Sequence, residues 1–199
     1  MIKKLFAWFF RVKGWTFIPT VPQEAYKRCV MIAAPHTTNW DAVYTIGAFE
    51  EMGVPVRFTV KKEAGFFPLG AILSSAGALW IDRSGSATDR KAKSYVDIMA
   101  DFFTDHEELV MLVSAEGTRS LVKQWKTGFY RVAQQAGVPI ALGYLDYERK
   151  EAGVGALIDV TGDMEYDLGR IMAFYSTIQG KFPQKFSLDE RYPPVAQNT

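Results

Sequence analysis

His36, one of the two histidines of this chain, precedes Asp41 by five positions and follows the apolar run 28–34. If that run is a buried strand and Asn39 caps the next helix, His36 lies in a loop and Asp41 in the first helical turn. A carboxylate bonded to one imidazole nitrogen fixes the tautomer and leaves the other nitrogen free to take a proton. This arrangement would make His36 a general base. On spacing alone, however, the simpler interpretation is a histidine that caps or packs in a turn.

A second candidate group is the segment SAEGTRS, residues 114–120, which follows another apolar run. Gly117 permits a tight turn there, and such a turn would direct Arg119 out from the end of a strand. The planar guanidinium is suited to a phosphate or a carboxylate. The alternative is a turn with a solvated arginine and a structural glutamate.

Further cations follow two other apolar runs. Lys61 and Lys62 come after residues 56–60, and Arg83 comes after residues 78–81. If these runs are neighbouring parallel strands, the cations would meet Arg119 at one edge of the sheet and could bind an anionic phosphate. Taken singly, each is more simply an ordinary surface charge.

The elements that must position these residues alternate along the chain. Short apolar runs predict buried strands, and longer amphipathic segments, several ending at glycine, predict helices. The expected strands are residues 28–34, 56–60, 78–81, 108–114, 138–145 and 155–162, and the expected helices are 39–53, 67–77, 88–105, 128–137 and 163–180. This alternation predicts a single α/β domain with a mixed, largely parallel sheet flanked by helices.

The N-terminal segment, residues 1–20, is rich in aromatic and basic residues. A helix over residues 2–13 would be amphipathic, and it could either lie on an anionic membrane surface or pack on the domain. We expect residues 21–182 to form the domain itself. Residues 183–199 are polar and contain proline, so we expect them to form a loosely held tail.

Composition excludes several classes of protein. The 23 basic and 22 acidic residues give a formal charge of +1, which argues against nucleic-acid binding. The single cysteine, Cys29, excludes an internal disulfide and a multi-cysteine metal cage, and its apolar surroundings indicate packing. No apolar stretch reaches the length of about 20 residues needed for a spanning helix.

Taken in order, these segments resemble the glycerolipid acyltransferase family, typified by the 1-acylglycerol-3-phosphate (lysophosphatidate) acyltransferases. Residues 36–41 (HTTNWD) match its HX4D motif, and residues 77–83 (GALWIDR) match its glycine-led apolar run ending in arginine. Its third motif is intact as Glu116, Gly117, Thr118 and Arg119, and residues 138–142 (VPIAL) resemble a weaker fourth. Pro35 and the pair Ser114-Ala115 depart from the residues common before the first and third motifs.

The resemblance implies transfer of a fatty acyl group from an acyl thioester, acyl-CoA or acyl carrier protein, to a hydroxyl of a lysophospholipid such as 1-acylglycerol-3-phosphate. It assigns proton abstraction to His36, oriented by Asp41. Binding of the acceptor phosphate falls to Lys61, Arg83 and Arg119, and shaping of the substrate site to Glu116, Gly117 and Thr118. No metal, cofactor or acyl-enzyme is expected, and the protein is expected at the cytoplasmic side of a membrane as a peripheral enzyme of phospholipid biosynthesis.

Other functions remain open at this point. Within the class, the acceptor could be an amine-bearing lipid or a lipid A precursor, or the donor could be a phospholipid. Outside it, the chain could be a catalytically silent lipid-binding module or a His/Asp hydrolase of esters or thioesters. Product analysis would separate these, because a hydrolase releases free fatty acid whereas a transferase makes a new acylated lipid.

Overall fold

A computed structural model of the chain describes residues 2–54, 56–61, 70–71, 74, 77–81 and 94–195. Within these residues a seven-stranded sheet has the strand order β1-β7-β6-β2-β5-β3-β4. Its strands are β1 (Thr16–Ile18), β2 (Arg28–Ala33), β3 (Val56–Lys61), β4 (Ala78–Ile81), β5 (Leu109–Ser114), β6 (Ile140–Asp146) and β7 (Glu151–Ile158). All neighbours pair in parallel except β6 and β7, which are antiparallel. The predicted mixed, largely parallel sheet is confirmed.

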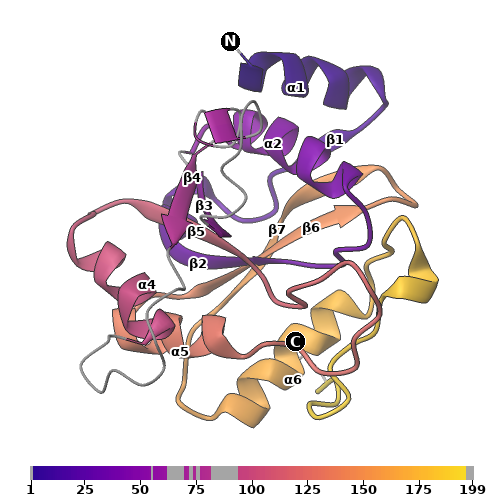
Figure 1. Ribbon diagram of the computed structural model, residues 1–199. Coiled ribbons are helices and arrows are strands. Elements are labelled where there is room, and N and C mark those ends of the chain that lie inside the picture. The colour runs from indigo at the N-terminus through magenta and orange to yellow at the C-terminus, as the bar shows by residue number, and fades with distance from the viewer. Residues whose placement is uncertain are drawn as a thin grey trace.

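Helices cover both faces of the sheet, so the fold has three layers (Figure 1). On one side lie α1 (Ile2–Val12) and α2 (Trp40–Met52). On the other lie α4 (Tyr95–Thr104), α5 (Gly128–Ala136) and α6 (Met164–Tyr175). Short 3-10 helices occur at Gln23–Tyr26 and Pro183–Lys185. Each α-helix overlaps a segment that was expected to be helical from its amphipathic pattern.

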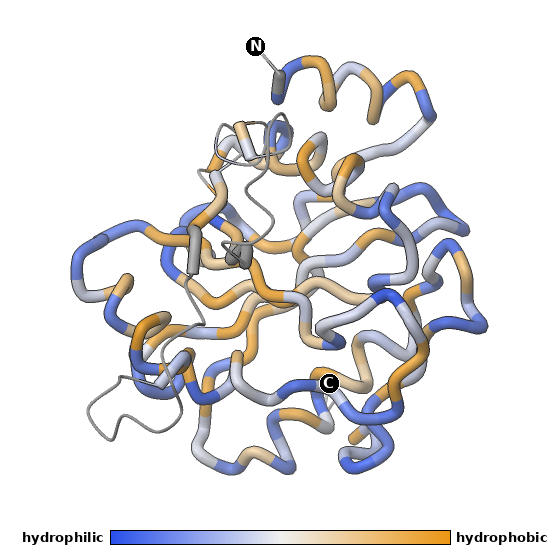
Figure 2. Tube along the Cα trace, in the orientation of Figure 1, coloured by the Kyte–Doolittle hydropathy of each residue, from blue (hydrophilic) through white to orange (hydrophobic). Residues whose placement is uncertain are grey.

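The central strand β2 shows why its sequence is apolar without a break. Val30 and Ile32 face the layer of α4, α5 and α6, whereas Cys29 and Met31 face the layer of α2. Successive side chains of a strand point to opposite faces, so a strand covered on both sides needs apolar residues at every position. The apolar strands accordingly run through the middle of the molecule (Figure 2). Burial of Cys29 agrees with the packing role expected for it.

Several element boundaries differ from those expected. β7 begins at Glu151 rather than 155, because it forms an antiparallel hairpin with β6 in which Asp146 faces Glu151. α6 ends at Tyr175 rather than 180. Of the helix expected over 67–77, residues 70, 71, 74 and 77 are described; the first three are helical, and Gly77 lies in a turn. Residues 88–93, the first part of the helix expected over 88–105, lie outside the described residues.

The C-terminal segment up to residue 195 is packed, contrary to the expected loose tail. Asp189 is buried and accepts a hydrogen bond from the Trp125 backbone N–H at 2.8 Å. Arg191 bonds the Asp189 carboxylate at 2.7 Å and donates to the Trp125 carbonyl at 2.7 Å. The composition of this segment is polar because its polar groups pair with one another and with the loop around Trp125.

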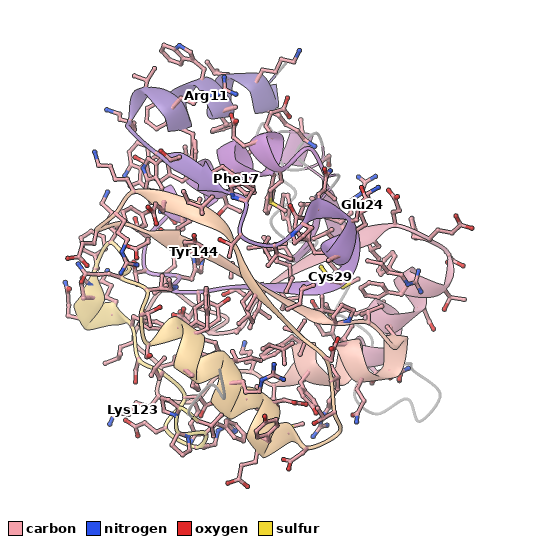
Figure 3. The ribbon with its side chains drawn as sticks, turned by 180° about the vertical axis from the view of Figure 1, so that it is seen from behind. Arg11, Phe17, Glu24, Cys29, Lys123 and Tyr144 are labelled. Atoms are coloured by element: carbon pink, nitrogen blue, oxygen red, sulfur yellow. The ribbon has the colours of Figure 1, made fainter. Side chains whose placement is uncertain are left out.

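The N-terminal segment divides into two parts. Residues 16–18 form β1 and pair in parallel with β7, so they belong to the sheet. Helix α1 lies across α2 with Ala7 and Phe10 buried, and Arg11 forms an ion pair with Glu51 of α2 at 2.6 Å (Figures 1 and 3). Packing on the domain, one of the two possibilities left open by the sequence, therefore accounts for one side of α1. In the described part of the chain, no helix is both long and apolar enough to cross a bilayer.

Gly47 of α2 allows the close contact between these helices. A Cβ atom at this position would lie 2.8 Å from Phe10 Cβ and 2.9 Å from the Phe6 carbonyl oxygen. Both distances are shorter than van der Waals contact, and the second involves backbone that cannot easily move. The separation of α1 and α2 therefore depends on the absence of a side chain here.

We expect Gly47→Ala to lower the free energy of unfolding by about 1–3 kcal/mol, because overpacking outweighs the gain in helix propensity. Gly128→Ala is the matched control, since a Cβ at Gly128 in α5 would meet nothing within 4 Å. Urea denaturation of both variants measures the difference. Equal stability of the two would show that the α1–α2 contact is not limited by this residue.

Candidate active site

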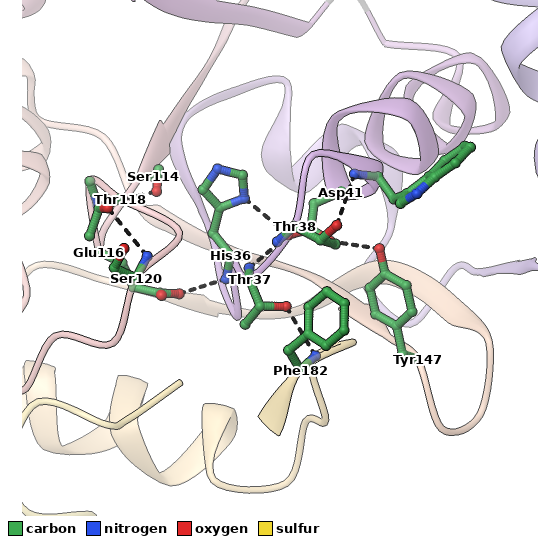
Figure 4. Close-up of polar contacts among 12 residues, drawn as sticks. His36, Thr37, Thr38, Asp41, Ser114, Glu116, Thr118, Ser120, Tyr147 and Phe182 are labelled. Carbon is green, nitrogen blue, oxygen red and sulfur yellow. Dashed lines mark hydrogen bonds and ion pairs between the residues drawn. The ribbon is translucent and has the colours of Figure 1, made fainter. Parts of the chain in front are cut away.

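The candidate site lies where β2 and β5 end side by side. These strands are parallel, and Ala33 of β2 pairs in register with Ser114 of β5. The loop that carries His36 and the loop that carries Glu116 therefore leave the same edge of the sheet (Figure 4). Ligands of open parallel sheets commonly bind at this carboxyl-terminal edge.

His36 and Asp41 meet as the sequence suggested. The Nδ1 atom of His36 lies 3.1 Å from Oδ2 of Asp41, whose carboxylate is buried while the imidazole is partly exposed. Because a carboxylate only accepts, Nδ1 carries the proton and Nε2 is left with a free lone pair. The geometry is that of a general base held by a carboxylate.

Asp41 is held by further donors from its own loop and from a distant turn. Its Oδ2 accepts from the backbone N–H groups of Thr37 at 2.8 Å and Thr38 at 3.0 Å. Its Oδ1 accepts from the Tyr147 hydroxyl at 2.6 Å. Asn39 is the N-cap residue, as expected, but its side chain makes no capping hydrogen bond. Asp41 binds the free N–H groups of the loop before the helix instead.

Glu116 faces the His36 loop rather than solvent. Its Oε1 accepts from the His36 backbone N–H at 2.7 Å, and its side chain is buried. Burial raises the pKa of Glu116 to about 8, although the His36 N–H opposes this and the nearby Asp41 charge adds to it. Glu116 thus braces the loop that carries the candidate base.

Gly117 lies in a tight turn and Arg119 points out from it, as the sequence predicted. Gly117 has φ of 68°, a left-handed conformation that favours glycine. Its N–H donates to Ser114 Oγ at 3.3 Å. Arg119 is exposed, and no ion pair joins it to another of the described residues. Thr118 lies on the same loop, where its Oγ1 accepts from the Ser120 N–H at 3.3 Å (Figure 4).

The other predicted cations are only partly described. Lys61 ends β3 and pairs in register with Ile81 of β4, so its backbone lies at the same carboxyl-terminal edge of the sheet. Its side chain is not described. Arg83 and Lys62 lie outside the described residues. Their roles therefore stay predictions.

An apolar cavity of about 230 Å³ opens beside the dyad and runs between α2 and the sheet. His36, Asp41 and Ser114 line it at one end of α2, and Met52 lines it at the other. Its remaining walls are mostly apolar side chains and glycines, including Phe17, Met31, Ile46, Phe49, Phe58, Leu112, Tyr144 and Leu145 (Phe17 and Tyr144 are labelled in Figure 3).

Two tyrosines at the site could not be found from sequence spacing. Tyr147 lies 106 positions from Asp41, in the turn after β6, and Tyr175 donates to the carbonyls of Ile32 and Gly143 at 3.0 and 2.9 Å. Neither belongs to a recognisable motif. The second histidine, His106, is exposed, and its Nδ1 lies 2.8 Å from the Phe102 carbonyl oxygen, so it is a surface residue.

Comparison with known proteins gives a match to the Acyltransferase family over residues 7–141. That span contains both loops of the site and most of the sheet. The chain belongs to the acyltransferase family. The resemblance inferred from the sequence motifs is thereby confirmed.

The chain is similar to two acyltransferases of known name. A "probable 1-acyl-sn-glycerol-3-phosphate acyltransferase" of Mycoplasma pneumoniae is 28% identical over 149 residues, which are 70% of this chain and 52% of the relative. The chain thus spans about half the length of this curated relative. The crystal structure of the 1-acyl-sn-glycerophosphate acyltransferase PlsC from Thermotoga maritima matches with a TM-score of 0.54 and 15% identity, over 84% of this chain and 71% of that one. This second likeness concerns the fold.

The raised pKa of Glu116 predicts a pH-dependent stability. Between its ordinary pKa near 4.5 and about 8, the folded protein binds a proton that the unfolded chain has lost, so this group's stabilisation declines as pH rises through that range. Glu116→Gln imitates the protonated form and should not show this decline. We expect the variant to gain stability relative to wild type as the pH rises from 5 to 8, measured by urea denaturation. Parallel pH profiles would contradict a protonated Glu116.

Proposed function

We propose that this acyltransferase moves a fatty acyl group from an acyl thioester, acyl-CoA or acyl carrier protein, to a hydroxyl of a lysophospholipid such as 1-acylglycerol-3-phosphate. The observation that carries the proposal is the His36–Asp41 pair at the mouth of an apolar cavity. The named function of the Mycoplasma relative supports the choice of acceptor.

The proposed reaction is direct. Nε2 of His36 takes the proton of the acceptor hydroxyl as its oxygen attacks the thioester carbonyl carbon, and Asp41 stabilises the imidazolium. The C–O bond forms, the C–S bond of the tetrahedral intermediate breaks, and the thiolate leaves with the proton from His36. The thioester brings its own activation, so the reaction needs neither a metal nor a cofactor. Cys29 is unsuited as a nucleophile because it is buried and its pKa is raised to about 12.

The acceptor phosphate is proposed to bind on the cationic side of this edge. Arg119 is exposed on the loop next to His36, and Lys61 ends a strand at the same edge. Arg83 is proposed as the third cation from its place in the second motif. Glu116, Gly117 and Thr118 would shape this site through the loop, Glu116 by its bond to the His36 backbone.

The cavity is proposed to hold the acyl chain of the donor. Asp41 and Met52 line opposite ends, and they are eleven positions apart in the helix, which is about 16 Å at about 1.5 Å per residue. An alkyl chain in this channel would place its thioester carbonyl near His36. The apolar walls would favour such a chain by the hydrophobic effect.

A labelled acyl-CoA and a labelled acyl carrier protein, each offered with a panel of lysophospholipids, test the proposal. We expect a diacyl product from wild type and a loss of at least about 100-fold with His36→Ala, the scale typical of a general base. His106→Ala is the matched control and should keep full activity.

Three results would contradict this reaction. Release of free fatty acid instead of a new lipid would identify a hydrolase. An acyl group retained on the protein, seen by intact mass, would show a covalent intermediate. Vesicle binding without any lipid product would favour the silent lipid-binding module.

The cavity predicts control of chain length by Thr45, which lines it one helical turn beyond Asp41. Thr45→Phe should fill the channel there and lower kcat/KM for long acyl donors at least about tenfold relative to short ones, as loss of several buried CH₂ groups implies. Thr45→Val is the control of similar size. An unchanged chain-length profile would place the acyl chain elsewhere.

Residues 1–20 are proposed to rest on the membrane through the outer side of α1. Leu5, Trp8 and Val12 are 61%, 59% and 60% exposed and lie at helical spacing on one face, opposite the buried Phe10. This apolar surface continues toward the site, because Phe9 stacks on Trp40 with 6.0 Å between ring centres. Two lysines adjoin it: Lys13 lies over the Phe9 ring and Lys181 over the Trp40 ring. Aromatic and basic side chains together suit an anionic lipid surface.

Vesicle co-sedimentation tests this surface. The double variant Leu5→Glu/Trp8→Glu should bind phosphatidylglycerol-containing vesicles at least about tenfold less tightly, since it removes two side chains from the lipid boundary. Tyr166→Glu changes an exposed aromatic residue on α6, across the sheet from α1 (Figure 1), and should bind like wild type. Equal binding by all three proteins would contradict a lipid contact through α1.

A further inference from the structure

Tyr147 reaches the site from a part of the chain that no motif covers. It follows β6 directly, and its hydroxyl donates to Oδ1 of Asp41 at 2.6 Å (Figure 4). We propose that Tyr147 is a positioning residue that fixes the Asp41 carboxylate so that Oδ2 holds Nδ1 of His36. This inference rests on the proposed function, in which His36 acts as the base.

The two carboxylate oxygens of Asp41 have different partners. Oδ2 accepts from the Thr37 and Thr38 N–H groups and from His36. These donors all belong to the loop that leads into α2, so they move with it. Tyr147 comes from the β6–β7 turn, and it ties the carboxylate to the sheet instead. Among the described residues it is the donor to Oδ1.

Tyr147 is itself firmly placed. Its ring meets Trp15 edge-on with 4.9 Å between ring centres and Tyr44 at 5.9 Å. Its backbone N–H donates to the Gln179 carbonyl at 2.9 Å. Burial, together with the bond and charge of Asp41, raises the pKa of Tyr147 far above its usual value, so the hydroxyl stays a donor.

The turn that carries Tyr147 is closed by the buried residue before it. Asp146 accepts from the backbone N–H groups of Glu148 at 2.9 Å and Arg149 at 3.1 Å, and its other oxygen binds the Arg149 guanidinium at 2.9 Å. A shift of this turn would break these partly buried hydrogen bonds and leave the buried Asp146 carboxylate short of donors. The turn therefore holds the Tyr147 hydroxyl in one position relative to Asp41 and His36.

Loss of the hydroxyl would leave Oδ1 of Asp41, a buried carboxylate, short of a donor. The carboxylate would then gain by rotating toward other donors or water, and Oδ2 would lose its alignment with His36. The expected consequences are a mixture of His36 tautomers and a slower proton transfer. Substrate binding, which does not use this bond, should change little.

The experiment compares Tyr147→Phe with Tyr44→Phe. Tyr44 belongs to the same aromatic cluster, and its hydroxyl makes no hydrogen bond to Asp41, so it controls for deletion of a phenol oxygen. Nitrogen-15 NMR of histidine-labelled protein reports the tautomer directly, because the chain has only His36 and His106. His106→Gln assigns the signals, and Asp41→Asn supplies the reference state without the carboxylate.

We expect wild type and Tyr44→Phe to show neutral His36 with its proton on Nδ1. Tyr147→Phe should move the signals toward those of Asp41→Asn and lower kcat by about tenfold or more, as loss of a charge-assisted hydrogen bond implies, with KM nearly unchanged. If Tyr147→Phe matches Tyr44→Phe in tautomer and kcat, or if both variants are equally impaired, the inference is wrong.

Failure of the proposed function would give a different result from failure of the Tyr147 inference. A His36→Ala variant with full activity would remove His36 from the reaction. The tautomer signals would still report whether Tyr147 holds the dyad, since they do not depend on turnover.

Discussion

The buried carboxylate of Asp41 is the group around which the site is organised. A carboxylate removed from water is costly unless hydrogen-bond donors replace its hydration. Here Thr37, Thr38, His36 and Tyr147 all donate to it. The loop before α2 takes its shape because its N–H groups turn toward this carboxylate, and the imidazole orientation follows from the same requirement. The need of the buried Asp41 carboxylate for hydrogen-bond donors, which the folded protein must satisfy, thus also positions the candidate base His36.

The second buried carboxyl of the site has the opposite environment. Asp41 is surrounded by donors, whereas Glu116 receives the His36 N–H on one oxygen and has a buried, unpartnered second oxygen among the described atoms. Burial accordingly raises the pKa of Glu116. The carboxyl groups of Asp41 and Glu116 lie on adjacent loops, and their different surroundings give them different roles. One orients the imidazole, and the other ties the two loops together at the ends of β2 and β5.

Helix α1 contributes to the site although it lies outside the sheet. Its Phe9 stacks on Trp40, and Trp15, just after the helix, packs on Tyr147. The same segment carries exposed apolar side chains on its outer side. A lipid surface bound there would lie next to the aromatic cluster that supports the dyad. The close approach of α1 to α2 at Gly47 makes this arrangement possible.

The sequence by itself determined most of the strands, the approximate positions of the α-helices and the local motifs. Continuous apolar runs, helical amphipathicity and glycine in tight turns are properties of neighbouring residues, and so is the reach of Asp41 back to His36 over five positions. It left undecided whether α1 packs on the domain, and it did not indicate the strand β1, the packed C-terminal segment or Tyr147. Those features depend on distant partners, such as the β7 residues that pair with β1 from 135 positions away. Only the tertiary structure brings such groups together, because their pairing energy arises from burial in the folded chain and leaves no local pattern.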